Sequence, residues 1–268
     1  MEINAPIGVL DSGVGGLSVL KCLHQLLPHE DFIYVGDTAR TPYGTRTEKE
    51  IRGFVAEIID WLAAQGVKQV VIACNTLTML GVDTLKGEHH FSVVGMSKGA
   101  QLLLNASKKK KIGVLATPFT ISTGAHKKAV LAADASAQVY PMPCPDFVTL
   151  IEGEQFGSER LAEAVAAYAA PLKKAGVDAV ILSCTHFPFI KEQIAAEFGP
   201  QVAVIDPAEA TAELAIDALH EQELLRSEGK GRVEVCCTAN VERVRRLAQR
   251  MLPASDCEFK EIDLKRKK

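Results

Sequence analysis

The sequence predicts an α/β protein with parallel sheets, arranged in two similar halves. Two observations support this prediction. Short apolar runs alternate along the chain with longer segments of helical period, which is the pattern of parallel sheets flanked by helices. Two strings of the first half also recur in the second half. A chain of 268 residues is long enough to form one large domain or two smaller ones.

The first half of the chain predicts three strands separated by helices. The predicted strands are Ile7–Leu10, Phe32–Val35 and Val70–Ala73. Apolar residues at helical spacing predict helices over Leu17–Leu27 and Ile51–Leu62. The third strand is apolar on both faces, as expected of a parallel strand that is covered by helices on both sides.

The second half of the chain repeats this alternation. Its predicted strands are Ile112–Leu115, Val180–Leu182, Val202–Ile205 and Val233–Val235, and its clearest helices are Leu161–Leu172 and Val241–Met251. The closing run Lys265–Lys268 is expected to be a solvated tail.

Charge and composition exclude several classes of protein. The net charge is −3, which argues against a nucleic-acid binder that depends on a basic face. No stretch approaches the roughly 18 apolar residues of a membrane span, so we expect no membrane partner. The start MEINAPIGVLDSG lacks a positive segment followed by an apolar run. We therefore expect no signal peptide and a cytoplasmic protein.

Seven cysteines are scattered through the chain, and no two of them form a C-x-x-C pair. This spacing signals neither a zinc ribbon nor a thioredoxin-type redox site. An odd number of cysteines in a cytosolic chain favours free thiols over a disulfide framework. We expect no bound metal.

An internal repeat is the most informative feature of the sequence. The string IGVL occurs at 7–10 and again at 112–115, offset by 105 positions. GVKQVVIAC at 66–74 matches GVDAVILSC at 176–184, offset by 110 positions. Both longer strings end in a cysteine followed by two polar residues, Asn75-Thr76 after Cys74 and Thr185-His186 after Cys184.

The repeat predicts paired roles for Cys74 and Cys184. Each cysteine would lie just beyond the carboxyl end of a parallel strand, where open α/β sheets bind ligands. Two facing halves would then place two thiols on opposite sides of one cleft, which suits proton removal from one face of a carbon and delivery to the other. The alternative is that both are inert core residues, because free cysteine is among the most buried residue types. The polar residues that follow each cysteine favour the catalytic interpretation.

Two loops after strands are further candidates for binding. The loop Asp11–Gly16 fits neither the dinucleotide nor the P-loop pattern, and we expect it to cradle a carboxylate at a helix N-terminus or to form only a tight turn. Asp11 would orient a substrate ammonium group, assist proton transfer at the thiol, or cap the following helix. The loop Gly36–Gly44 is a candidate binding loop, or an ordinary surface connection.

Four motifs together carry a family resemblance. DSGVGGLSV, YVGDTARTPYG, ACNT and CTHFP, in this order and spacing, resemble the glutamate racemases of bacterial cell-wall synthesis. The resemblance spans nearly the whole chain. It implies two α/β domains related by a pseudo-two-fold axis, with the active site in the cleft between them. Residues 1–97 with 208–268 would form the first domain, and 98–207 the second.

The resemblance also implies an activity. It implies interconversion of L- and D-glutamate without pyridoxal phosphate, metal or other cofactor, in a homodimer, with D-glutamate feeding peptidoglycan synthesis. Carried over position by position, the catalytic acid/bases are Cys74 and Cys184. The positions that match substrate contacts are Asp11, Ser12, Tyr43, Gly44, Asn75, Thr76, Thr117, Thr185 and His186. The positions that match supports of the thiols are Asp37, Glu152 and His186.

Alternatives remain open at this stage. A racemase for aspartate is one, because a single methylene is worth only about 1–3 kcal/mol of discrimination in a pocket. Others are a decarboxylase or isomerase of the same fold that uses one cysteine, a protein that only binds an amino acid, and a redox pair of thiols.

Overall fold

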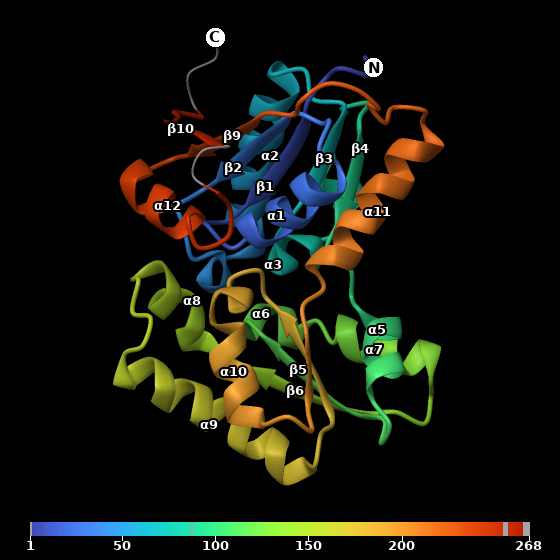
Figure 1. The fold of residues 1–268 in the computed structure, drawn as a ribbon, viewed down its shortest axis with the longest axis vertical. Coiled ribbons are helices and arrows are strands. Elements are labelled where there is room, and N and C mark those ends of the chain that lie inside the picture. The colour runs from blue at the N-terminus through green and yellow to red at the C-terminus, as the bar shows by residue number, and fades with distance from the viewer. Residues whose placement is uncertain (1, 87, 254–256, 265–268) are drawn as a thin grey trace. The chain divides into compact units, whose positions relative to one another are not determined.

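A computed structural model describes residues 2–86, 88–253 and 257–264. The chain forms two compact units, Met1–Met96 with Ala208–Lys268, and Ser97–Pro207. Each unit contains one parallel sheet, of six and four strands respectively, which confirms the predicted α/β class (Figure 1). The run Lys265–Lys268 lies outside the described residues.

The six-stranded sheet has the strand order β10-β9-β2-β1-β3-β4, and all its strands are parallel. Its strands are β1 (Ile7–Asp11), β2 (Phe32–Gly36), β3 (Gln69–Ile72), β4 (Ser92–Gly95), β9 (Val233–Cys237) and β10 (Cys257–Glu261). The helices of this unit are α1 (Leu17–Leu26), η1 (Tyr43–Thr45), α2 (Glu48–Ala64), α3 (Asn75–Thr78), α4 (Val82–Leu85), α11 (Ala208–Glu221) and α12 (Val241–Ala248).

The four-stranded sheet has the order β6-β5-β7-β8 and is also parallel. Its strands are β5 (Lys111–Ala116), β6 (Gln138–Pro143), β7 (Ala179–Ser183) and β8 (Ala203–Ile205). The helices of this unit are α5 (Ala100–Ala106), α6 (Pro118–Ser122), α7 (Ala125–Ala133), α8 (Pro145–Glu152), α9 (Glu159–Ala175), η2 (Phe187–Ile190) and α10 (Lys191–Phe198).

The repeat seen in the sequence corresponds to equivalent strand pairs. The segment β2-β1-β3-β4 of the larger sheet has the same order as β6-β5-β7-β8. In the first pair Ile7 is the partner of Gln69, and in the second Ile112 is the partner of Ala179. The sequence offsets of 105 and 110 therefore relate residues that occupy the same place in the two sheets.

The C-terminal segment completes the first unit. After Pro207 the chain returns as α11, which packs against α1 and β4 (Figure 1). It then adds β9 and β10 to the outer edge of β2, with Gly36 beside Cys237 in the last strand pair. Two turns that are distant in sequence, the one after β2 and the one after β9, are thereby neighbours.

Local sequence explains where the helices begin. The α2 helix starts with a capping box, in which Thr47 accepts from the backbone of Glu50 and the Glu50 side chain accepts in return from the backbone of Thr47. Ser158 caps the backbone N–H of Leu161 at the start of α9. These caps set the first residue of each helix, and the buried apolar faces of α2 and α9 stabilise the turns that follow.

Three strands escaped the sequence analysis because their residues lack the continuous apolar pattern. All four residues of β4 are only half-buried, and β6 (QVYPMP) contains two prolines. A proline is tolerated in β6 because this strand lies at an edge of the sheet, where one side needs no hydrogen-bonding partner. The other missed edge strand, β10, carries charged residues.

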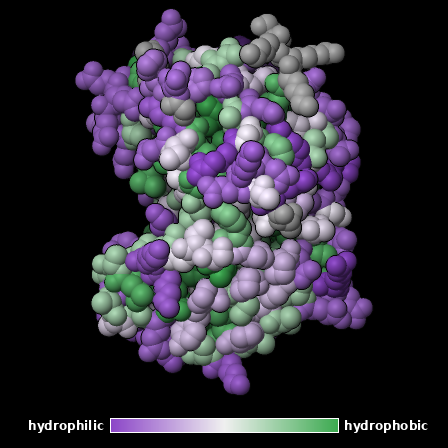
Figure 2. Space-filling view, turned by 180° about the vertical axis from the view of Figure 1, so that it is seen from behind, coloured by the Kyte–Doolittle hydropathy of each residue, from purple (hydrophilic) through white to green (hydrophobic). Residues whose placement is uncertain are grey.

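The surface is predominantly hydrophilic on the face drawn in Figure 2, with hydrophobic groups interspersed. Among the described residues, the large hydrophobic side chains that are exposed are Ile3, Leu26, Leu102 and Leu214. No helix in the described part of the chain has the length and apolarity that a membrane crossing requires.

Candidate active site

The first unit gathers its candidate residues at the carboxyl ends of three adjacent strands. Asp11 closes β1, Asp37 follows β2, and Cys74 lies two residues after β3. All three side chains are almost completely buried. Because β1 lies between β2 and β3, the three turns that follow these strands are neighbours at the carboxyl end of the sheet.

Ser12 is the immediate neighbour of the Cys74 thiol, with Ser12 Oγ 3.7 Å from Cys74 Sγ. The strand pairing explains this contact. Leu10 is the partner of Ile72 in the sheet, so the residues two steps further along each strand, Ser12 and Cys74, lie side by side. The hydroxyl can donate to a thiolate or accept from a thiol.

The side chain of Asn75 is buried without a hydrogen-bonding partner. It is 2% exposed, and neither its Oδ1 nor its Nδ2 has a partner among the described residues. A buried amide left unpaired costs about 1–3 kcal/mol. Such a group, directly after the thiol, is suited to a ligand that brings both a donor and an acceptor.

Asp37 lies at the centre of a buried network. Its Oδ2 accepts from Arg40 Nε at 2.6 Å and from the hydroxyl of Tyr43, and its Oδ1 accepts from Thr238 Oγ1 at 2.9 Å. Arg40 also donates to Glu57 at 2.6 Å. The donors to Asp37 thus come from its own loop and from the C-terminal segment.

Tyr43 is held rigidly by this network. Burial and the neighbouring Asp37 carboxylate together raise the pKa of the Tyr43 phenol far above its ordinary value. The phenol therefore stays protonated and donates to Asp37. Because Tyr43 and Gly44 lie in the short helix η1, this bond fixes the loop that the sequence analysis singled out for binding.

The second unit presents Cys184 in the equivalent place. Cys184 directly follows β7, is 6% exposed, and lies with its Sγ 4.0 Å from His186 Nδ1. The other ring nitrogen, Nε2, lies 2.8 Å from Glu152 Oε1 at the end of α8. Thiol, imidazole and carboxylate thus form a linear chain in the interior of the unit.

The neighbours of His186 and its burial shift the pKa of the imidazole in opposite directions. Burial alone would lower the pKa of the imidazole, but the Cys184 thiol and the Glu152 carboxylate outweigh this effect and raise the pKa of His186 well above its ordinary value. The contacts with Cys184 and Glu152 therefore favour the protonated ring more than its burial alone would allow.

Of the remaining candidates, Thr117 and Thr185 lie at the carboxyl end of the second sheet, and Thr76 lies at the carboxyl end of the first. Thr117 follows β5 and caps α6 by accepting from Thr120 N at 3.3 Å. Ala116 is the partner of Ser183, so Thr117 is the strand neighbour of Cys184, as Ser12 is of Cys74. Thr185 is buried between Cys184 and His186, and Thr76 is buried after Asn75.

One alternative for the first loop is wrong. Asp11 does not cap α1, which has no side-chain cap, and its Oδ2 instead accepts from Gly13 N at 2.9 Å inside the loop. The backbone N–H groups of Leu17 and Ser18 donate to the carbonyls of Val14 and Gly15 within the turn, and the carboxylate cradle stays a prediction. The turn is tight, since a Cβ on Gly36 would come within 2.2 Å of the Gly13 carbonyl oxygen.

Three further residues lie near the site. Arg40 and Thr238 bond to Asp37, and the only signal for Thr238 in the sequence was its position three residues after the predicted strand Val233–Val235. Cys144 follows β6 at the same edge as Cys184, and its pKa is raised mainly by burial, so its thiol remains protonated. Its sequence context, Met-Pro-Cys-Pro, gave no such indication.

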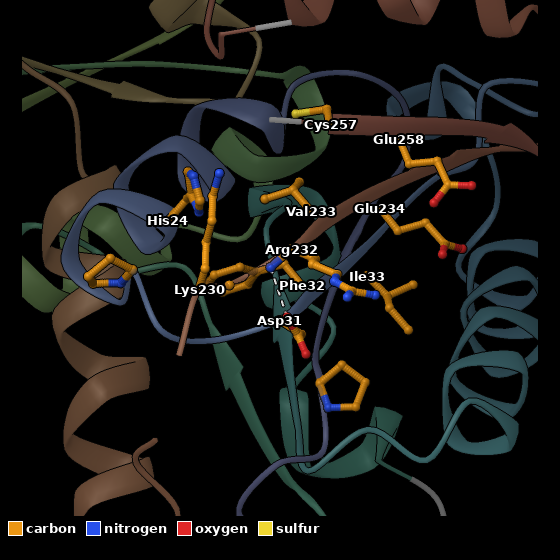
Figure 3. A pocket seen from close by; sticks show the side chains of 13 residues that line it. His24, Asp31, Phe32, Ile33, Lys230, Arg232, Val233, Glu234, Cys257 and Glu258 are labelled. Carbon is orange, nitrogen blue, oxygen red and sulfur yellow. Dashed lines mark hydrogen bonds between the residues drawn. The ribbon is translucent and has the colours of Figure 1, made fainter. Parts of the chain in front are cut away.

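A cavity of about 910 Å³ lies elsewhere in the first unit. It is lined by the residues that begin β2, β9 and β10, namely Phe32, Val233 and Cys257 (Figure 3). It therefore opens at the amino ends of the strands, whereas the thiol and carboxylates lie at the carboxyl ends. Among the described residues, no group of three or more His, Cys, Asp or Glu side chains is arranged to hold a metal ion.

Comparison with known proteins places the chain in a family. A family model described as Asp/Glu/hydantoin racemase matches residues 7–215. The glutamate racemase of Lysinibacillus sphaericus is 37% identical over 265 residues, covering 98% of this chain and 100% of that protein. The chain belongs to the Asp/Glu/hydantoin racemase family, and this near-full-length relative is one of its glutamate racemases.

Solved structures agree with this placement. The Bacillus anthracis glutamate racemase isoform RacE1 superposes with a TM-score of 0.90 at 32% identity, covering 98% of this chain and 99% of that one. The glutamate racemase of Francisella tularensis, solved in complex with D-glutamate, has a TM-score of 0.86 at 32% identity and the same coverage.

Proposed function

We propose that this chain interconverts L- and D-glutamate, and that Cys74 and Cys184 act as the two acid/base groups. The observation that carries the proposal is the equivalence of the two thiols. Each follows the same strand of its sheet, is nearly buried, and has a hydroxyl residue beside it on the neighbouring strand. Its near-full-length relatives are glutamate racemases.

The proton transfers balance without any cofactor. One cysteine enters as a thiolate and takes the α-proton, so that a C–H bond breaks and an S–H bond forms. The other enters as a thiol and delivers its proton to the opposite face of the same carbon. After each turnover the protonation states of the two cysteines are exchanged. The enzyme is then in the protonation state that acts on the opposite enantiomer.

Electrostatics must assist the first step, because an α-proton is far less acidic than a thiol of pKa about 8.5. Hydrogen-bond donors on the substrate carboxylate stabilise the negative charge that develops in the transition state. Asn75 is suited to this role, since its buried amide has unused bonding capacity. Further hydroxyls at the carboxyl ends of the two sheets belong to Thr76, Thr117 and Thr185.

The remaining residues fall into three supporting groups in this proposal. Asp11 and Ser12 lie beside Cys74, where they contact substrate or the thiol. Glu152 and His186 support Cys184 through the chain of contacts described above. Asp37 acts at one remove, by fixing Tyr43 and the loop that contains Gly44.

Isotope exchange in deuterated water tests the proposal. Both enantiomers of glutamate should acquire deuterium at the α-carbon while optical rotation decays to zero, and aspartate should react much more slowly. A binding protein would give neither signal, a decarboxylase would release carbon dioxide, and an aspartate racemase would reverse the substrate preference. Any of these three results would refute the proposed activity.

The assembly and location are part of the same proposal. We expect a homodimer, which light scattering coupled to gel filtration would detect as twice the mass of 28.9 kDa. We expect the cytoplasm, because all seven cysteines are free thiols, as is usual in a reducing compartment.

A further inference from the structure

The turns that follow β2 and β9 are bonded to each other by a reciprocal clamp. Both turns have the sequence Thr-Ala, Thr38-Ala39 in one and Thr238-Ala239 in the other. Thr38 Oγ1 donates to Ala239 O at 2.6 Å and accepts from Ala239 N at 3.0 Å. On the other side, Thr238 Oγ1 accepts from Ala39 N at 2.9 Å.

Strand register explains why the two turns meet. Gly36 is the partner of Cys237 in the last pair of β2 and β9, so the next residues, Asp37 and Thr238, continue the pairing beyond the sheet. The backbone N–H of Thr238 still donates to Gly36 O at 3.2 Å. The C-terminal segment thus reaches the same sheet edge as Cys74.

The two halves of the clamp differ in one respect. The Thr38 hydroxyl is engaged with the backbone of the opposite turn, whereas the Thr238 hydroxyl also donates to Asp37 Oδ1 at 2.9 Å. Because it already accepts from Ala39 N, its own hydrogen is directed to the carboxylate. Of the two threonines of the clamp, only Thr238 therefore orients Asp37. The Asp37 carboxylate in turn accepts a hydrogen bond from the hydroxyl of Tyr43.

We propose that Thr238 is a positioning residue of the active site, which acts through Asp37 on Tyr43 and so holds the loop that contains Gly44 in its substrate-binding conformation. This inference rests on the proposed racemase function. It extends the site to a part of the chain beyond residues 7–215, which the family model matches. Since the loop binds substrate and does not transfer protons, the contribution of Thr238 falls on substrate binding.

Paired threonine variants test the proposal, with racemisation of glutamate as the assay. Thr238→Val should raise KM about tenfold, the effect of losing a hydrogen bond to a charged group, and change kcat little. Thr238→Ser keeps the hydroxyl and should restore the wild-type KM. Thr38→Val is the matched control, because it loses two hydrogen bonds of the same clamp but none to Asp37. It should leave KM near that of the wild type.

A double-mutant cycle tests the route through Tyr43. Tyr43→Phe removes the hydroxyl at the other end of the path, so Thr238→Val should add little to its effect on KM. Equal KM increases in Thr38→Val and Thr238→Val, or additive effects in the cycle, would show that the clamp only stabilises the fold. Urea unfolding of each variant confirms that a folded protein is assayed, and Thr238→Ala replaces Thr238→Val if the latter does not fold. A wild-type protein that fails to racemise glutamate would instead refute the proposed function.

Discussion

His186 Nε2 and Glu152 Oε1 lie 2.8 Å apart inside the second unit, where both side chains are nearly inaccessible to solvent. The opposite ring nitrogen faces Cys184, so the carboxylate acts on the thiol through the imidazole. A buried pair of this kind is costly to break, because removing one partner leaves the other uncompensated.

The first prediction concerns the charge on His186. Glu152→Gln removes a carboxylate that raises the pKa of His186, while burial continues to lower it. The imidazole of the variant should therefore lose its proton at a lower pH than in the wild type. We expect the alkaline limb of the kcat profile to move to lower pH by about one unit or more. Glu159→Gln, at an exposed position at the start of α9, is the control and should leave the profile unchanged.

Unfolding experiments check the same charge independently. A raised pKa means that the native state binds more protons than the unfolded chain between the ordinary histidine pKa, about 6.5, and the raised value. The stabilisation is complete below about pH 6.5 and is lost as pH rises through the folded value. The wild-type free energy of unfolding should thus fall across this window more steeply than that of Glu152→Gln. Parallel curves would contradict the assignment.

The second prediction concerns the thiols. Cys74→Ala and Cys184→Ala should each abolish racemisation, a loss of at least the roughly 10²–10⁴-fold that one acid/base group contributes. Because the two enantiomers have equal free energy, kcat/KM must remain the same in both directions for any variant with residual activity. Cys22→Ala, at a half-buried position on α1, should behave as the wild type. Near-normal turnover in either test variant would rule out the two-base mechanism.

The third prediction links binding to stability at Asn75. Replacing this residue with leucine removes two unpaired buried polar atoms at similar volume, so the free energy of unfolding should rise by about 1–3 kcal/mol. The same change should lower kcat/KM at least tenfold, because the substrate loses its amide partner. Urea titration and steady-state kinetics measure the two effects. A variant that loses stability and keeps its activity would show that the Asn75 amide does not bind the substrate.

The fourth prediction concerns the buried ion pair between Lys68 Nζ and Glu30 Oε2, which are 2.6 Å apart. Lys68 also donates to the carbonyls of Ile3 and Leu224, and so joins the start of the chain to the C-terminal segment. Lys68→Met should cost about 3–5 kcal/mol, because the Glu30 carboxylate is left buried without the cation of its ion pair. The double variant with Glu30→Leu should recover much of this loss. If the single variant unfolds at the wild-type urea concentration, the pair contributes no stability.

The sequence predicted those parts of the fold in which a local pattern sets the structure. The buried central strands β1, β2, β3, β5 and β7 are all recognisable from apolar runs, and the repeated string identified β3 and β7 as equivalent. The strands β4, β6 and β10 could not be recognised in this way. They lie at sheet edges, where half-burial allows polar residues and prolines.

The candidate site divides similarly. Cys74 and Cys184, which lie within two residues of the end of a predicted strand, could be placed from the sequence because each strand carries its cysteine to the carboxyl end of its own sheet. The contact between Thr238 and Asp37 could not be found, since Thr238 is distant in sequence and its approach depends on how β9 pairs with β2. The contacts that join Cys184, His186 and Glu152 depend on the packing of α8 against η2, the short helix that begins directly after His186, and no periodicity of the sequence encodes this packing.

The two units have matching strand registers, but the groups around their thiols are not the same. The matching registers place the two thiols in equivalent positions. Asp11 at the end of β1 corresponds to Ala116 in β5, and Thr76 stands where the second unit has His186, the imidazole that Glu152 contacts. L- and D-glutamate would thus be deprotonated by two cysteines whose neighbouring groups differ. The primary isotope effects for the L- and D-enantiomers should then differ, even though the equilibrium between the two favours neither.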